Sequence, residues 1–272
     1  MVIKIAAIQM NSTHSVSENL GILEPLLLQA SEQGARLALL PENFAFMGSH
    51  KQLVSDIMED FNDGPIQSFV AEKAKDYGIW IIAGSIPIKN NDQSRSYARC
   101  MVFDSNGALI SFYDKIHLFD VVVNGKIYKE SSFIEPGSTP VSIQTPWFKL
   151  GLSICYDVRF PELYRSKAFN GVDLIVVPAA FTEETGLVHW ETLLTSRAIE
   201  NLSYILAAAQ WGKHYGDRKT YGHSMIINPW GERVNALPSG NGVAIAEIDL
   251  ELIAEIRENF PALLHRKIFS DS

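Results

Sequence analysis

The chain has 272 residues, and its 23 lysines and arginines against 31 aspartates and glutamates give a net charge of −8 at neutral pH. Apolar residues make up 47% and charged residues 20%, which is an ordinary soluble globular composition. The acidic excess argues against a nucleic-acid-binding protein, because affinity for polyanions comes mainly from Lys and Arg side chains. No apolar run approaches the ~18 residues of a membrane-spanning helix, so no membrane partner is expected.

The cysteines and the N-terminus predict a cytoplasmic protein. Two cysteines, Cys100 and Cys155, are too few for a disulfide framework and fit a reducing compartment. The first apolar run is interrupted at Gln9 and Asn11, which is not typical of a secretory signal.

Short apolar segments alternate along the chain with longer amphipathic ones, as in an α/β protein. Several of these segments lack polar alternation, which is typical of strands buried on both faces. Strands are predicted at 3–8, 37–40, 79–83, 101–103, 109–113, 150–155, 174–177, 205–209, 224–227 and 243–248.

A capping box from Ser15 to Glu18 predicts a helix that runs toward Gly34, with Pro25 causing a kink or a late start. Further helices are predicted at 65–77, 161–170, 187–201 and from about residue 250. The sequence has no internal repeat and no linker rich in Pro, Gly or Ser. A single domain spanning residues 1–272 is therefore the simplest interpretation.

Common cofactor and metal motifs are absent from the sequence. There is no HExxH, no CxxC and no tight His/Cys cluster, so a zinc site is not expected. There is no GxxxxGK[ST] phosphate-binding loop either. Residues 240–242 contain the first two glycines of a dinucleotide-binding turn but lack the third, and they predict a hairpin turn.

Cys155 ends a predicted strand, and the turn after it opens a helix at Pro161. A thiol at such a turn lies above the sheet, near backbone N–H groups that favour a thiolate. The alternative is a small buried apolar residue, the commoner environment of a free cysteine. Position alone leaves the two interpretations about even, whereas Cys100 lies inside a predicted strand and is expected in the core.

Two other ionisable residues occupy the same topological position as Cys155. Glu42 follows the strand at 37–40, and Lys115 follows the strand at 109–113. Ligands of α/β proteins bind outside the carboxyl ends of strands. Singly, Glu42 is explained as a helix-start carboxylate and Lys115 as a solvated strand end. Together with Cys155 they indicate a site, because a thiol nucleophile needs a base and a group that stabilises an oxyanion.

Four motifs in this order resemble the nitrilase, or carbon–nitrogen hydrolase, superfamily over nearly the whole chain. They are the base motif at 40–43, the lysine motif at 113–118, a second glutamate motif at 130–131 with 136–137, and the nucleophile motif at 153–162. Within the superfamily, residues 115–120 and 185–191 are similar to amidases that act on deaminated glutathione and on ω-amides. Residues 207–210 and 221–225 are more similar to the former group. The loop at 121–128 departs from both.

The resemblance implies a four-layer αββα sandwich of two sheets, assembled into homodimers or larger homo-oligomers. It implies a cysteine-dependent amidase that needs no metal or organic cofactor. Glu42 would be the base of Cys155, and Lys115 would hold the oxyanion together with the backbone N–H of Tyr156. Glu130 would orient Lys115 or the substrate, or would only anchor a loop by an ion pair.

The same resemblance suggests residues that contact the substrate. Arg159 either binds a substrate carboxylate or is a structural residue paired with Asp157 or Glu162, and we favour the structural role. Phe181 and His189 either line the pocket or serve packing and a solvated helix start. Arg197 is a further basic residue near the site motifs.

The expected substrate is a small carboxylate-bearing amide, with deaminated glutathione first on resemblance. Three other activities on the same fold stay open, namely those of an ω-amidase, an N-carbamoyl amidohydrolase and a nitrilase. A non-catalytic binding protein with this fold is the alternative from a different class.

Overall fold

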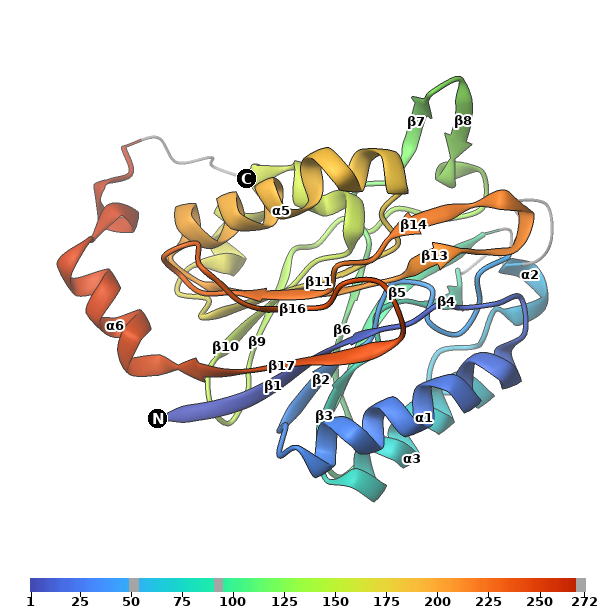
Figure 1. Cartoon of the computed structure of the whole chain (residues 1–272), viewed down its shortest axis with the longest axis horizontal. Coiled ribbons are helices and arrows are strands. Elements are labelled where there is room, and N and C mark those ends of the chain that lie inside the picture. Colours follow the sequence, from blue (N-terminus) through green and yellow to red (C-terminus); the bar gives the residue numbers. More distant parts are fainter. Residues whose placement is uncertain (49–53, 91–94, 268–272) are drawn as a thin grey trace.

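Two β-sheets stack face to face between two layers of helices (Figure 1). The computed structural model describes residues 1–48, 54–90 and 95–267, and the rest of the predicted domain 1–272 lies outside this part. Within the described part, no helix combines the length and the apolar character needed to cross a membrane.

The first sheet has the strand order β17-β1-β2-β3-β5-β4, with β6 also paired to β5. Its strands are β1 (Val2–Gln9), β2 (Leu37–Leu39), β3 (Trp80–Ile82), β4 (Ile86–Lys89), β5 (Ser96–Phe103), β6 (Leu109–Asp114) and β17 (Gly242–Asp249). The second sheet has the order β16-β15-β12-β11-β10-β9. Its strands are β9 (Val141–Gln144), β10 (Lys149–Leu152), β11 (Leu174–Ala179), β12 (Tyr204–Ala209), β15 (Met225–Ile227) and β16 (Arg233–Ala236).

Strand β1 explains why the sequence has apolar runs rather than alternation. It pairs antiparallel with β17 and parallel with β2, so that Ala6 lies between Ile245 and Ala38. Side chains on one face of β1, such as Ile5, pack with the second sheet. Ile8, on the other face, packs with the helices. Both faces are therefore buried, which confirms the predicted four-layer αββα sandwich.

Helices α1 (Val16–Glu32) and α3 (Pro65–Tyr77) cover the outer face of the first sheet (Figure 1). The predicted N-cap is confirmed, because the Ser15 side chain accepts a hydrogen bond from the Glu18 N–H. The late start that Pro25 suggested is wrong, since α1 begins at Val16 and continues through the exposed proline.

Helix α5 (Glu183–Asn201) covers the outer face of the second sheet (Figure 1). It begins before the predicted start at 187, because the Thr182 side chain caps the helix by accepting from the Thr185 N–H. Its buried face carries Trp190, Leu194 and Ala198, as predicted. The shorter helices are α2 (Val54–Ile57), α4 (Pro161–Arg165) and α6 (Leu250–Asn259), and 3-10 turns include η1 (Glu130–Ser132), η2 (Cys155–Arg159), η3 (Lys167–Phe169) and η4 (Tyr215–Asp217).

Two expectations about turns are wrong. The strand predicted at 150–155 ends at Leu152, because the Asp157 carboxylate accepts a hydrogen bond from the Ile154 N–H and the chain turns into η2. The turn at 240–242 does not close a hairpin, because β16 and β17 belong to different sheets.

The strands that the sequence did not predict are short and mostly half-exposed, and apart from the valines at 121–123 they lack an apolar run. Four of these strands form two hairpins at the rim of the sandwich (Figure 1). One is β7 (Asp120–Val123) with β8 (Lys126–Lys129), which contains the atypical loop 121–128, and the other is β13 (Trp211–Lys213) with β14 (Lys219–Tyr221).

Gly186 lets α5 approach β14 closely. A Cβ atom at this position would lie 2.3 Å from the Cβ atom of Tyr221, whereas a Cβ at Gly21 in α1 would have no neighbour within 4 Å in the described part of the chain. Alanine is preferred over glycine in a helix by about 1 kcal/mol. We therefore expect Gly21→Ala to raise the free energy of unfolding by up to about 1 kcal/mol. Gly186→Ala should lower it by about 1–3 kcal/mol.

Urea unfolding of both variants beside the unmodified protein measures the two free energies. Equal stabilisation by the two substitutions would show that α5 and β14 can separate at no cost, contrary to the packing described here.

Candidate active site

Strands from both sheets end at one cavity. Glu42 follows β2, Lys115 follows β6, Cys155 follows β10 and Ala180 follows β11. All four residues line a cavity of about 110 Å³. The wall also contains aromatic side chains and an arginine, namely Phe46, Phe119, Tyr128, Phe133, Tyr156, Phe181 and Arg218. The topology thus brings together the three residues that the sequence singled out.

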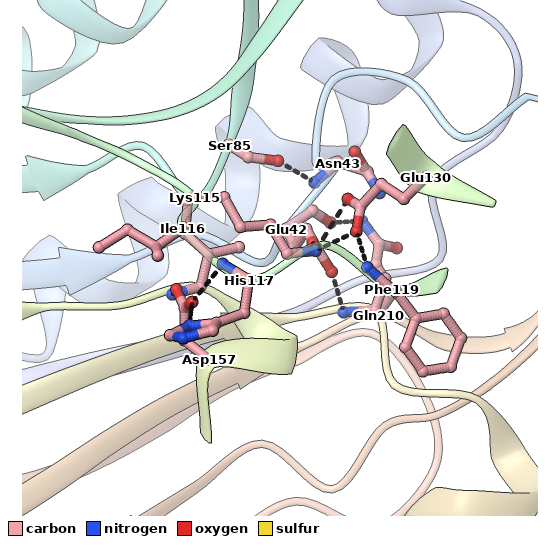
Figure 2. Close-up of polar contacts among 12 residues, drawn as sticks. Glu42, Asn43, Ser85, Lys115, Ile116, His117, Phe119, Glu130, Asp157 and Gln210 are labelled. Carbon is pink, nitrogen blue, oxygen red and sulfur yellow. Dashed lines mark hydrogen bonds and ion pairs between the residues drawn. The ribbon is translucent and has the colours of Figure 1, made fainter. Parts of the chain in front are cut away.

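The Lys115 ammonium lies between two carboxylates (Figure 2). Its Nζ donates to Glu42 Oε1 at 2.7 Å and to the two oxygens of Glu130 at 2.8 and 2.9 Å. Only 1% of Lys115 is exposed. Burial alone would lower the pKa of Lys115, but the Glu130 and Glu42 carboxylates raise it above its ordinary value. The lysine therefore stays charged and fixes both glutamates.

Glu42 is held at both oxygens. Its Oε2 accepts a hydrogen bond from the Ala180 N–H at 2.8 Å, opposite the Lys115 bond to Oε1. Burial alone would raise the pKa of Glu42, but Lys115, the Cys155 thiol and Arg218 together hold it below its ordinary value. The carboxylate is therefore ionised at neutral pH and is available as a base.

Glu130 belongs to the same cluster, but its pKa is shifted in the opposite direction from that of Glu42. Besides Lys115, it accepts a hydrogen bond from the Phe119 N–H at 2.6 Å (Figure 2). Burial and the Glu42 carboxylate raise the pKa of Glu130 despite the Lys115 charge. Glu130 therefore holds the Lys115 ammonium in place and also connects η1 to the loop before β7.

The turn that carries Cys155 is held by Asp157, a fully buried carboxylate. Asp157 Oδ2 accepts from the Ile154 N–H at 2.8 Å and from the Tyr113 hydroxyl at 2.7 Å. Its Oδ1 contacts the His117 N–H at 3.0 Å and the His117 ring Nδ1 at 2.7 Å (Figure 2). The same residue therefore fixes the cysteine turn to the chain on both sides of Lys115. Cys155 itself has φ 47°, a conformation that few residues other than glycine adopt.

The Cys155 thiol lies in an environment that keeps it protonated. Burial and the Glu42 carboxylate raise the pKa of the thiol, and Lys115 and the Ala180 N–H only partly oppose them. The Ala180 N–H favours the thiolate, as expected of a backbone N–H at this turn, but burial and Glu42 outweigh it. A protonated thiol beside an ionised carboxylate is the arrangement that a nucleophile and its general base require.

Comparison with known proteins identifies the family to which this geometry belongs. The family described as carbon–nitrogen hydrolase matches residues 4–258. The chain belongs to the carbon–nitrogen hydrolase family. It is accordingly a hydrolase that acts on carbon–nitrogen bonds other than peptide bonds, as the resemblance of its motifs predicted.

Two curated relatives of this carbon–nitrogen hydrolase match it over almost their whole length. It is 42% identical to the deaminated glutathione amidase of Synechocystis sp. over 265 residues, which cover 96% of this chain and 97% of the relative. It is 36% identical to the omega-amidase NIT2 of Danio rerio over 268 residues, which cover 97% of this chain and 94% of the relative.

Solved structures agree with the fold. The chain is similar to the C. elegans NitFhit protein with a TM-score of 0.91 and 38% identity, and the match covers 98% of this chain and 65% of that chain. It is also similar to a Glu-to-Gln mutant of the amidase from Nesterenkonia sp. AN1, with a TM-score of 0.78 and 25% identity over 95% of this chain and 99% of that chain. That structure shows the result of Michael addition of acrylamide at the active-site cysteine.

The four predicted substrate contacts lie in two places. Tyr156 and Phe181 line the cavity, whereas Arg159 and His189 lie beside it. The Arg159 guanidinium is 5.1 Å from the centroid of the Phe181 ring, and its Nη atoms are 3.3 Å from His189 Nδ1. The prediction that Arg159 pairs with Asp157 or Glu162 is wrong, because Arg159 forms no ion pair within the described residues and Asp157 contacts His117 instead.

Arg197 is a structural residue. Its Nε donates to the Val158 carbonyl at 2.9 Å and its Nη1 to Glu200 at 2.6 Å, so the side chain is already bonded within the protein.

Arg218 also lines the cavity, just before β14, and was not among the residues predicted from the sequence. Its Nη2 donates to the Ala180 carbonyl at 3.3 Å, on the residue whose N–H binds Glu42. No sequence signal marked it, because it lies in a polar loop with Asp217 and Lys219, where a solvated arginine is ordinary.

Replacing Glu42 by glutamine should lower the pKa of Cys155. The substitution removes a negative charge that raises the thiol pKa and leaves the Lys115 ammonium, which lowers it. The rate of alkylation by iodoacetamide, followed at the Cys155 peptide by mass spectrometry, should therefore reach its half-maximum at a lower pH in Glu42→Gln.

Cys100 is the internal control, because burial alone raises the pKa of its thiol and Glu42 is not among the causes. An unchanged or higher midpoint for Cys155 would mean that Glu42 does not control the thiol.

Proposed function

We propose that the chain is a cysteine-dependent amidase in which Cys155 attacks the carbonyl carbon of a small amide. The observation that carries the proposal is the protonated Cys155 thiol beside the ionised Glu42 carboxylate in one cavity. As the sulfur–carbon bond forms, Glu42 accepts the thiol proton, so a nucleophile is generated only when substrate is present.

The oxyanion of the tetrahedral intermediate is bound by Lys115 Nζ and by the backbone N–H of Tyr156. Lys115 donates to both oxygens of Glu130, so it can redirect one of these hydrogen bonds to the oxyanion while it keeps its ion pair with Glu130. Glu130 therefore acts as a positioning residue. Donors already in place stabilise developing charge without the cost of reorganisation.

The intermediate collapses by breaking the C–N bond, and Glu42 passes its proton to the leaving ammonia or amine. Glu42 then takes a proton from a water molecule that attacks the thioester carbonyl. The carbon–sulfur bond then breaks, the acid leaves, and the proton on Glu42 returns to the Cys155 sulfur. These steps use side chains of this chain and water, with no cofactor.

The substrate that we propose is a small carboxylate-bearing amide, deaminated glutathione first. The 42% identity to a relative named for that activity supports it. An ω-amide of a dicarboxylate is the second candidate, supported by the 36% identity to an omega-amidase. Carbamoyl amino acids and nitriles complete the panel of substrates to be tested.

We further propose that residues 1–272 form one domain, that the protein is cytoplasmic and that it assembles into homodimers or larger homo-oligomers. The family match over residues 4–258 supports the first point, and the free thiols of Cys100 and Cys155 support the second. Leu187 and Val188 on α5 are 72% and 65% exposed and support an assembly surface.

Cys155→Ala should abolish ammonia release from the best substrate of the panel, while Cys100→Ala should retain most of it. Only the first substitution removes the nucleophile, since Cys100 lies in the core of the first sheet. A coupled ammonia assay with purified protein measures both. Near-normal turnover by Cys155→Ala would contradict the mechanism, and a thiol inert to labelling without any turnover would favour a non-catalytic binding protein.

Lys115→Met should lower kcat by roughly 10²–10³, the usual effect of removing one oxyanion donor. KM should change little, because the oxyanion develops only after binding. Steady-state kinetics on the substrate identified by the panel separate the two constants. A change confined to KM would assign Lys115 to substrate binding instead.

A further inference from the structure

Arg218 is held on a fixed part of the cavity wall. Its carbonyl accepts a hydrogen bond from the His214 N–H at 2.7 Å, across the end of the β13–β14 hairpin. The His214 ring contacts the Ser12 carbonyl at 2.9 Å and the Thr220 hydroxyl at 2.7 Å. Burial lowers the pKa of His214 to about 4, so the ring is neutral and anchors the hairpin without adding charge.

The guanidinium of Arg218 has unused hydrogen-bonding capacity. A guanidinium has five N–H donors, but among the described residues that of Arg218 forms a single hydrogen bond, from Nη2 to the Ala180 carbonyl. Its Nε is buried without a hydrogen-bond partner among the described residues. No carboxylate of the described part of the chain forms an ion pair with it, in contrast to Lys115, which is bound by two.

The distribution of charges around the cavity also favours the binding of an anion at Arg218. Lys115 is paired with two glutamates, so this cluster offers no net attraction to a substrate carboxylate. Arg159 lies outside the lining, and Lys129, the other cation of the wall, is exposed. Arg218 lies close to Glu42 because both side chains bind the backbone of Ala180. Glu42 accepts from the Ala180 N–H, and Arg218 donates to the Ala180 carbonyl.

We propose that Arg218 binds the carboxylate at the far end of the amide substrate while the scissile carbonyl lies at Cys155. The buried Nε and an Nη atom offer two parallel donors, which match the two oxygens of a carboxylate. The inference rests on the proposed amidase function and assigns its specificity. It makes Arg218 the residue that selects carboxylate-bearing amides over neutral ones.

The first test compares kcat/KM for glutaramate with that for pentanamide, which has a methyl group in place of the far carboxylate. Arg218→Gln should reduce the ratio of the two values by about 10- to 150-fold, the ~1.5–3 kcal/mol of a hydrogen bond to a charged group at ~1.4 kcal/mol per tenfold. Arg218→Lys should retain part of the preference, because it keeps the charge but loses the two parallel donors.

Arg159→Gln and Lys129→Gln are the matched controls, since each removes another cation near the site. Both should keep the preference for glutaramate. A ratio that is unchanged in Arg218→Gln, or that collapses in either control instead, overturns the proposal.

The second test does not depend on turnover. Glutarate and pentanoate are compared as protectants of Cys155 against iodoacetamide, in the unmodified protein and in Arg218→Gln. Glutarate should protect at lower concentration, and this advantage should fall in Arg218→Gln by about the same 10- to 150-fold. Urea unfolding establishes that the variant is folded.

The two tests separate the inference from the proposed function. Loss of the glutarate advantage in Arg218→Gln, in a protein that hydrolyses no amide of the panel, supports the carboxylate site and contradicts the amidase. An equal glutarate advantage in both proteins overturns the Arg218 inference even if the amidase is active.

Discussion

The ion cluster of Lys115 with Glu42 and Glu130 is the interaction on which the site depends. Isolated buried charges are costly, and removing one partner of a buried pair is strongly destabilising. Each member comes from a different segment, so the cluster forms only when the end of β2, the end of β6 and η1 have met. The same contacts that satisfy these groups hold Glu42, the proposed base, and Lys115, the proposed oxyanion donor, at one cavity.

Further hydrogen bonds connect this cluster to the cavity wall and fix the turn at Cys155. Ala180 donates its N–H to Glu42 and accepts from Arg218 through its carbonyl, so the end of β11 links Glu42 to the β13–β14 hairpin. The Asp157 carboxylate fixes the turn at Cys155 by accepting hydrogen bonds from the Tyr113 hydroxyl and the His117 N–H. The site is therefore built from strand ends that two stacked sheets hold rigidly, and its chemistry follows from which charges are satisfied.

Prediction from sequence succeeded where one local cause dominates. The capping Ser15 and the Pro65 start fixed two helices, and apolar runs located the central strands. It failed where a hydrogen bond to a polar side chain sets the end of an element, because the apolar pattern does not show that end. The strand before Cys155 ends early because of Asp157, and α5 begins early because of Thr182. Half-exposed strands such as β13 and β14 have no apolar run, since pairing with a neighbour rather than burial defines them.

The sequence by itself determined the family, the sheets of the sandwich and the presence of a thiol, a carboxylate and an amine at strand ends. Only the tertiary structure decided their charge states, because a pKa depends on burial and on neighbours that are remote in the chain. It raised the thiol pKa of Cys155 and kept Glu42 ionised. It also turned Arg218 from an ordinary loop residue into part of the cavity wall, because burial and hydrogen-bond partners exist only once the hairpin has folded against the ends of the strands.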